Sequence, residues 1–154
     1  MITLDRLVNV LASSGARLVC CPRSRDVLLR SLIVHDPTDT RVATGEVFLA
    51  VGLDTPDVAV RLAARARAAV ALVRAPAPLE PTVQASAEEA GVAVVLAEPE
   101  VSWSHLTGLA YGLVLEGRET EAGRGPTDLF ALADTLAATV GGPVVIEDQL
   151  SRVL

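Results

Sequence analysis

Residues 45–73 have the sequence GEVFLAVGLDTPDVAVRLAARARAAVALV, in which a strand pattern, a helix pattern and a second strand pattern follow one another. The apolar run at 46–51 has the length of a strand and is followed by a glycine. Residues 54–57 (Asp-Thr-Pro-Asp) then supply a helix cap, a proline at the first helical position and an acidic residue in the first turn. The run at 69–73 is again of strand length, so the stretch predicts a parallel βαβ unit with a right-handed crossover.

The same alternation continues on both sides of this unit. Residues 3–14 predict an amphipathic helix that Thr3 caps and Gly15 ends. Further strands are predicted at 16–21, 31–35 and 92–97, and further helices at 81–90, ended by Gly91, and at 102–117, capped by Ser102. We therefore expect an α/β fold with a mostly parallel sheet flanked by helices.

The segment 116–126 contains no large apolar side chain and predicts a linker. We assign residues 1–118 to an α/β domain and residues 119–126 to the linker. Residues 127–154 predict one amphipathic helix and a hairpin, which are too small to form a core alone. We interpret them as the truncated start of a second domain, with the apolar face of the helix at 127–140 covering the first domain or a second copy.

Composition and charge exclude several classes of protein. The chain has 154 residues, of which 51% are hydrophobic, so it can bury a core and is not intrinsically disordered. Its net charge of −6 argues against a broad basic surface for nucleic acid. All basic residues are Arg, and without Lys the chain has neither a phosphate-binding P-loop nor a Schiff-base lysine. We expect no membrane span, no secretion signal and no cofactor, and therefore a cytoplasmic protein.

Cys20 and Cys21 are adjacent on a predicted strand, where neighbouring side chains point to opposite faces. This arrangement disfavours a shared metal ion and an ordinary disulfide, and the chain has no further cysteine. We expect two reduced thiols and no metal site. A vicinal-disulfide redox switch stays an alternative.

The loop after the run 46–51 is the first candidate ligand site. It connects a strand to a helix N-terminus, where backbone N–H groups and the helix dipole favour small anions and nucleotides. Gly52 and Asp54 of this loop, with Thr44 and Glu46 before the strand, are the residues we expect to contact a ligand. A plain connecting loop is the alternative, because no Gly-x-Gly-x-x-Gly motif is present.

The two histidines are the other candidates for chemistry. His35 lies at the end of a predicted strand beside Asp36, and we add it to the expected ligand contacts, with a structural role as the alternative. His105 lies near Ser102 and Ser104, a combination found in hydrolases. Ser102 is better explained as a helix cap, and no Gly-x-Ser-x-Gly elbow occurs, so we expect no catalytic residue.

Two further patterns concern helix surfaces. Arg61, Arg65 and Arg67 share one predicted helix, and a solvated face is favoured over a phosphate or DNA contact. Gly108 and Gly112 lie four residues apart in another predicted helix. They permit close approach of a neighbouring backbone, which is either the sheet or a second subunit.

Several stretches of the chain resemble the N-terminal domain of PucR-type bacterial transcription regulators, the purine-catabolism-regulator-like family. They are ITLDRL at 2–7, GEVFLAVG at 45–52, AVALV at 69–73 and AGVAVVL at 90–96. The resemblance covers residues 1–118. Residues 133–148 are similar to the start of the GAF-like domain that often follows in this family.

The resemblance implies a non-catalytic signal-sensing and dimerisation module that responds to a purine or nitrogen-linked effector. Family members end in a DNA-binding helix-turn-helix domain that this sequence lacks, so DNA contact is expected only through such a downstream domain. The segment 45–52 is also similar to the N-terminal domains of Mur ligases and HPr kinases, which share a related α/β architecture. The alternatives are therefore a nucleotide- or UDP-substrate-binding domain of a Mur-ligase-like enzyme, and a purely structural dimerisation domain.

Overall fold

The computed structural model describes residues 2–39, 41, 43–121 and 141. The chain divides into two compact units, Met1–Gly117 and Arg118–Leu154. The sheet and the helices that cover it belong to the first unit, apart from residues 118–121 at the end of the last described helix, which belong to the second.

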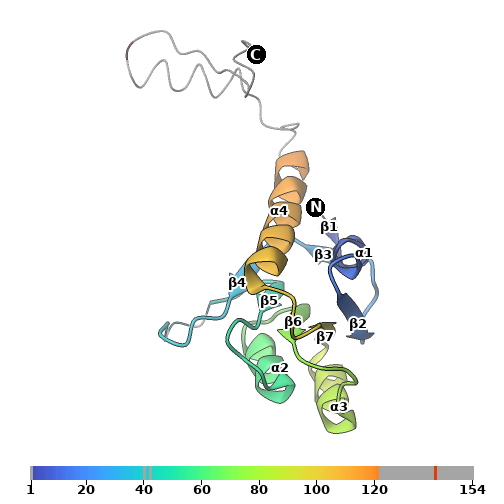
Figure 1. Ribbon diagram of the computed structural model, residues 1–154. Helices are drawn as coiled ribbons and strands as arrows, with labels where there is room; N and C mark the ends of the chain where they lie inside the picture. The colour runs from blue at the N-terminus through green and yellow to red at the C-terminus, as the bar shows by residue number, and fades with distance from the viewer. Residues whose placement is uncertain (1, 40, 42, 122–140, 142–154) are drawn as a thin grey trace. The chain divides into compact units, whose positions relative to one another are not determined.

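The described elements alternate between strands and helices for most of the chain (Figure 1). They are β1 (Ile2–Thr3), α1 (Leu4–Ala12), β2 (Ala16–Cys20), β3 (Leu28–Leu29), β4 (Leu32–Val34), β5 (Val47–Leu49), α2 (Pro56–Arg65), β6 (Val70–Arg74), α3 (Pro81–Ala90), β7 (Ala93–Ala97) and α4 (Trp103–Glu121). Five strands form one sheet in the order β2-β7-β6-β5-β4. β2 is antiparallel to β7, and the other neighbours are parallel.

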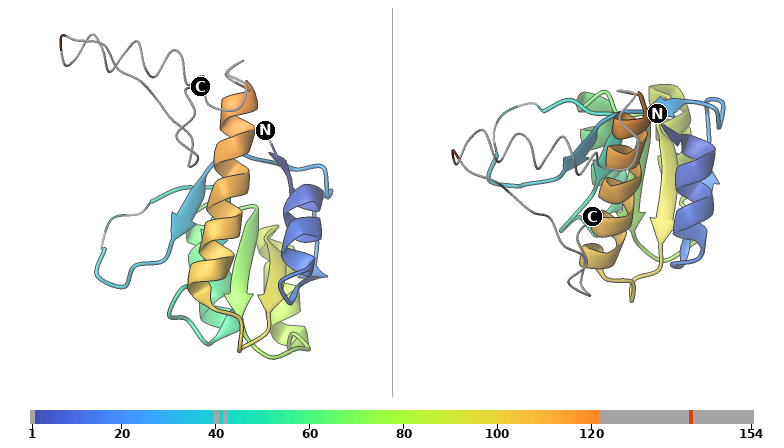
Figure 2. Two further views of the ribbon diagram at one scale, coloured as in Figure 1. Left: turned by 45° about the horizontal axis from the view of Figure 1, so that its top comes forward. Right: turned by 90° about the horizontal axis from the view of Figure 1, so that it is seen from above.

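Two helices cover each face of the five-stranded sheet (Figure 2). α1 and α4 lie on one face, where Leu7 and Leu106 are fully buried in a cluster with Leu72. α2 and α3 lie on the other face, where Ala63 and Ala87 are fully buried in a second cluster. The predicted α/β fold with a mostly parallel sheet flanked by helices is therefore confirmed.

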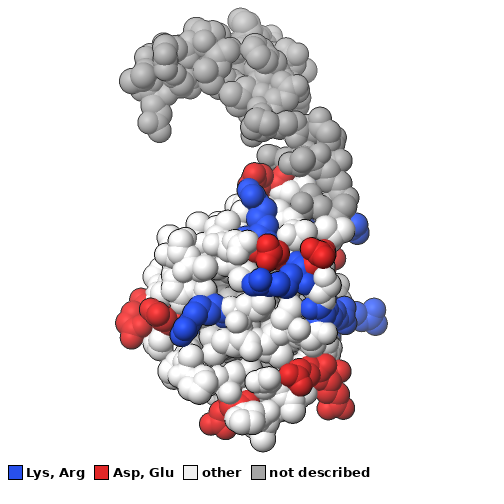
Figure 3. All heavy atoms as spheres, turned by 90° about the vertical axis from the view of Figure 1, so that its right-hand side faces the viewer, with Lys and Arg blue, Asp and Glu red and all other residues white. Residues whose placement is uncertain are grey.

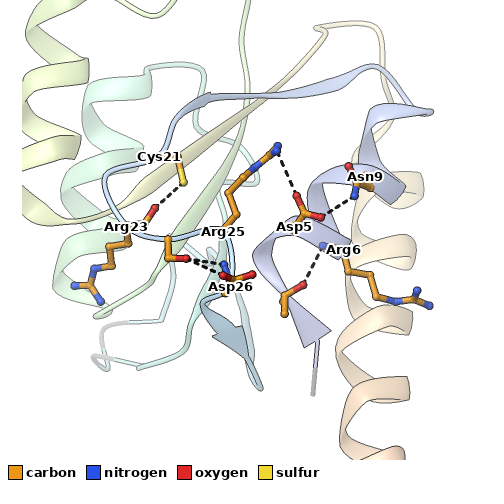
Figure 4. Close-up of polar contacts among 9 residues, drawn as sticks. Asp5, Arg6, Asn9, Cys21, Arg23, Arg25 and Asp26 are labelled. Atoms are coloured by element: carbon orange, nitrogen blue, oxygen red, sulfur yellow. Dashed lines mark hydrogen bonds and ion pairs between the residues drawn. The ribbon is translucent and has the colours of Figure 1, made fainter.

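The helix boundaries follow local signals in the sequence. The Thr3 hydroxyl accepts a hydrogen bond from the backbone N–H of Arg6 at 3.2 Å and so caps α1 as predicted (Figure 4). Gly91 ends α3 with a φ of +69°, a conformation that favours glycine. The Ser102 hydroxyl accepts from the N–H of His105 at 3.1 Å at the start of α4.

Two features differ from the predictions. β1 and β3 form a short antiparallel pair that was not predicted, because strands of two residues are too short to show a hydrophobic period. α4 continues to Glu121, so the first residues of the predicted linker at 119–126 are helical. The segment 116–121 contains no proline to stop the helix, and Gly117 alone does not end it. The helix and hairpin predicted within 127–154 lie outside the described residues.

Within the described part of the chain, no helix combines the length and the apolar character that a membrane span requires. The face that carries α1 and β2 shows acidic and basic groups interspersed (Figure 3). This face therefore offers no continuous basic surface for nucleic acid.

Truncation of a side chain in the central strand provides a test of this core. Leu72 of β6 is 1% exposed, so Leu72→Ala should lower the free energy of unfolding by about 2–5 kcal/mol through lost burial and a cavity. Leu28→Ala, at a side chain that is 43% exposed, is the matched control and should change it by less than about 1 kcal/mol. Urea denaturation measures both, and equal losses would contradict the arrangement of the core.

Candidate functional site

The carboxyl ends of the four parallel strands meet at one edge of the sheet, which is where ligands bind in open α/β sheets. His35 follows β4 at this edge, and Gly52 and Asp54 follow β5. Thr44 and Glu46 precede β5 and therefore lie toward the opposite edge. The five residues predicted as ligand contacts are thus not brought together in one site.

His35 lines a pocket of about 190 Å³, which we call the His35 pocket. It lies between β4, the loop after β4 and the last turns of α2. Its described lining residues are Ile33, Val34, His35, Asp36, Asp39, Arg41, Ala43, Phe48, Leu62, Arg65 and Ala66. Phe48 is buried, and Leu62 and Ile33 are half-buried, so apolar side chains form its inner surface. Its charged lining residues, Asp36, Asp39, Arg41 and Arg65, are exposed.

His35 is positioned by its backbone and by a ring contact. Its N–H donates to the carbonyl oxygen of Leu49 at 2.9 Å and extends the pairing of β4 with β5. Its imidazole lies 6.1 Å from the Phe48 ring, centroid to centroid, with the two planes tilted by 46°. Neither ring nitrogen of His35 bonds to a residue that the structure describes, so the imidazole can donate to or accept from a ligand.

Two carboxylates at the opening are held by hydrogen bonds within their own loop. Asp36 accepts from the hydroxyl of Thr38 at 2.7 Å and from its N–H at 2.8 Å, and these bonds lower the pKa of the Asp36 carboxyl. Asp39 accepts from the side chain and the N–H of Arg41, which lowers the pKa of Asp39 in the same way. Both groups are therefore anionic hydrogen-bond acceptors at neutral pH.

Arg65 brings a positive charge to the same pocket from the last turn of α2. Among the described residues it has no ion pair or hydrogen bond, whereas Arg61, one turn earlier, pairs with Asp57 at 3.2 Å. The guanidinium of Arg65 is thus free to bind a ligand oxygen. The sequence predicted a solvated face for both arginines, and both are exposed in the structure, where Arg65 also lines the pocket.

Glu46 has a structural role, because its carboxylate is held by hydrogen bonds within the fold. One of its carboxylate oxygens accepts from the N–H of Arg30 at 2.6 Å, from the N–H of Ser31 at 3.0 Å and from the Ser31 hydroxyl at 3.3 Å. The Ser31 hydroxyl also accepts from the N–H of Glu46 at 3.1 Å. These bonds tie the start of β4 to the start of β5, while Thr44 is exposed in the preceding loop.

Asp54 lines a different pocket of about 520 Å³ between the N-termini of α2 and α3. Asp57 and Glu80 also line it, and no basic residue is among its described lining residues. This negative surface does not fit the small anion that the loop was expected to bind. Gly52 has a φ of +74°, so it serves the turn after β5.

His105 has a partner that the sequence could not indicate. Its Nε2 lies 2.9 Å from the hydroxyl oxygen of Ser14, which is 91 positions away in the chain. A serine and a histidine at this distance resemble a nucleophile and its base, but no described carboxylate bonds to the imidazole to orient it. The contact joins the turn after α1 to the first turn of α4.

The two cysteines are free thiols in different environments. Cys20 is buried, and burial is the main reason that its pKa is raised, so its thiol is not activated. Cys21 is exposed, and its thiol donates to the carbonyl oxygen of Arg23 at 3.0 Å (Figure 4). Among the described residues, no group of three or more His, Cys, Asp or Glu side chains is placed to hold a metal ion.

The comparisons with known proteins returned nothing: no family model, curated protein or solved structure matches the chain. The chemistry of the His35 pocket is therefore the basis for inferring a function. Its lining combines the apolar aromatic side chain of Phe48, anionic acceptors at Asp36 and Asp39, and a cationic donor at Arg65.

Removal of the Glu46 carboxylate tests its structural role. Glu46→Ala leaves the N–H groups of Arg30 and Ser31 without this acceptor and should lower the free energy of unfolding by about 1–3 kcal/mol. Thr44→Ala changes an exposed neighbour and should stay within about 0.5 kcal/mol of the wild type. Urea denaturation distinguishes the two, and an unchanged stability of Glu46→Ala would show that these bonds contribute nothing.

The Asp36 carboxyl provides a test by pH. Thr38→Val removes the hydroxyl that contributes most to the lowered pKa, so the pKa of Asp36 should rise toward its ordinary value. The wild-type loop is stabilised by Asp36 at neutral pH, and this contribution is lost as the pH falls through the lowered pKa. NMR titration of the side-chain carboxyl carbon measures the change, with Thr38→Ser as the control that keeps the hydroxyl. A pKa that is the same in Thr38→Val and the wild type would contradict the assignment.

Proposed function

We propose that this chain is the N-terminal sensing module of a PucR-type transcription regulator and that it binds a small planar nitrogen heterocycle in the His35 pocket. The observation that carries the proposal is the combination of a buried aromatic ring with both acceptors and donors around one opening. A purine base presents a flat apolar face, ring N–H donors and carbonyl or ring-nitrogen acceptors, and so matches each of these groups.

The size of the pocket supports a ligand of one or two fused rings. Its volume of about 190 Å³ is below the roughly 300–1,000 Å³ of pockets for drug-sized ligands. In this proposal the base packs on Phe48, the carboxylates of Asp36 and Asp39 accept from its N–H groups, and Arg65 donates to a carbonyl oxygen. His35 completes the ring of polar contacts.

Sensing without catalysis fits the side chains at this place. None of the described residues that line the His35 pocket carries a hydroxyl, a thiol or a primary amine that could act as a nucleophile. The pocket also spans two kinds of element, since Arg65 comes from α2 and His35 from the end of β4. Ligand contacts to both favour one spacing of α2 relative to β4, which is the form that a regulatory signal can take.

Ligand binding is tested by thermal shift and calorimetry with hypoxanthine, xanthine, urate and allantoin. UDP and ATP are included to test the alternative of a Mur-ligase-like domain. A ligand that binds only the folded state raises the melting temperature. We expect a shift with at least one purine and a loss of affinity of about tenfold or more in Arg65→Gln, since a charge-assisted hydrogen bond contributes about 1.5–3 kcal/mol.

Arg61→Gln is the matched control, because Arg61 lies one turn away on α2 and pairs with Asp57 outside the pocket. Its affinity for the purine should equal that of the wild type. Absence of any shift across the panel, or equal losses in the two arginine variants, would count against the proposal. A response to UDP or ATP alone favours the enzyme-domain alternative.

A further inference from the structure

We propose that the pocket of about 520 Å³ that Asp54 lines, which we call the Asp54 pocket, is a second ligand site and binds an aliphatic diamine. In this complex the two ammonium groups of the diamine bind the carboxylates of Asp54 and Glu80, and its methylene chain lies on the apolar walls. The site shares no lining residue with the His35 pocket and does not depend on the sensing function.

The size and the position of the Asp54 pocket are those of a ligand site. Its volume lies within the roughly 300–1,000 Å³ of small-molecule pockets. Residues 54–57, which follow β5, and residues 75–80, which follow β6, line it together. These two strands are parallel neighbours, so the pocket lies at the edge of the sheet where ligands bind in open α/β folds.

Apolar side chains form the walls of the Asp54 pocket. They belong to Pro56, Ala75, Pro76, Pro78, Leu79 and Val83. The three prolines have no backbone N–H, so at these positions the backbone offers a ligand acceptors but no donor. None of the described lining residues is aromatic, so the walls fit an alkyl chain better than a stacked ring.

The two carboxylates assigned to the diamine have no partner in the described part of the chain. The side chains of Asp54 and Glu80 form neither a hydrogen bond nor an ion pair with any described residue. Glu80 is the N-cap residue of α3, yet its side chain does not cap the helix. The third carboxylate of the pocket, Asp57, pairs with Arg61 at 3.2 Å. Two unpaired carboxylates therefore correspond to two ammonium groups.

The charge of the Asp54 pocket favours a cation. Each helix N-terminus contributes about half a positive charge, so α2 and α3 together offset about one of the three carboxylates. Arg61 neutralises one more, and no described lining residue is basic. The pocket thus keeps a negative charge, which attracts an amine and disfavours a phosphate or a nucleotide.

The arrangement suits a diamine better than a metal ion. A divalent cation such as Mg²⁺ or Ca²⁺ needs several oxygen ligands around one point, at about 2.0–2.6 Å. In the described part of the chain, no three His, Cys, Asp or Glu side chains are placed in this way, so the three carboxylates of the pocket do not converge. A flexible ligand with separated charges can reach carboxylates that a single ion cannot.

Amide NMR of the labelled 154-residue chain, titrated with putrescine or cadaverine at constant ionic strength, tests the site. Exposed ion pairs are weak, so we expect saturable binding with a Kd of about 1 mM. The perturbed amides should cluster at residues 54–57 and 75–83. Butylamine, which has one ammonium group, should bind more weakly, and uncharged 1,4-butanediol should not bind.

The variant Asp54→Asn/Glu80→Gln keeps the shape of both side chains and should lower the affinity for the diamine about tenfold. Its melting temperature should equal that of the wild type, because both carboxylates are exposed and unpaired. Glu89→Gln/Glu100→Gln is the matched control. It removes the same charge from two exposed residues outside the pocket and should bind the diamine as the wild type does.

The absence of saturable diamine binding, or equal affinities in the two double variants, would overturn the inference. Stronger perturbation of the same amides by Mg²⁺ or by a tetralysine peptide would also overturn it, by assigning the pocket to a metal ion or to a basic protein segment. Hypoxanthine, xanthine, urate and allantoin are titrated into the same variants. Their binding should be unchanged in Asp54→Asn/Glu80→Gln, and diamine binding should be unchanged in Arg65→Gln, so the two proposals fail independently.

Discussion

Strand β6 is buried on both of its faces: Val70 and Leu72 belong to the cluster under α1 and α4, while Ala71 and Val73 belong to the cluster under α2 and α3. A strand in this position can have neither face open to water, so helices must cover both sides of the sheet. This requirement fixes the crossover connections between parallel strands and directs all of their following loops to one edge. The Asp54 pocket, between the N-termini of α2 and α3, lies at this edge, whereas the His35 pocket lies beside the edge strand β4 against the last turns of α2.

The two edges of the sheet have different roles. At the edge where β4 and β5 begin, one carboxylate oxygen of Glu46 accepts hydrogen bonds from the backbone N–H groups of Arg30 and Ser31. In the loop that follows β4, the carboxylates of Asp36 and Asp39 are held by hydrogen bonds within the loop, and both residues also line the His35 pocket. The carboxylate that stabilises the fold, Glu46, is therefore separate from the carboxylates that can bind a ligand, Asp36 and Asp39. Removal of the Glu46 carboxylate should not affect ligand binding, and removal of the Asp36 or Asp39 carboxylate should not affect the pairing of β4 with β5.

Local signals made much of the fold predictable, because each depends on neighbours within a few residues. The Thr3 cap, the glycine that ends α3 and the Ser102 cap are of this kind. The sites were harder to predict because they depend on contacts between distant residues. Nothing near Glu46 in the sequence indicates that it binds a backbone segment 15 and 16 positions earlier. Arg65 shows the same helical pattern as Arg61, and only the tertiary fold places it at the pocket that His35 also lines.

Backbone amide NMR of the labelled chain during titration with the purine that gives the largest thermal shift tests the location of the site most directly. The account predicts that the perturbed amides cluster at residues 33–39, at Phe48 and at 62–66, with little change at Glu46 or at Ser14 and His105. Perturbations centred on Asp54 and the start of α3, or spread evenly over the domain, would contradict it.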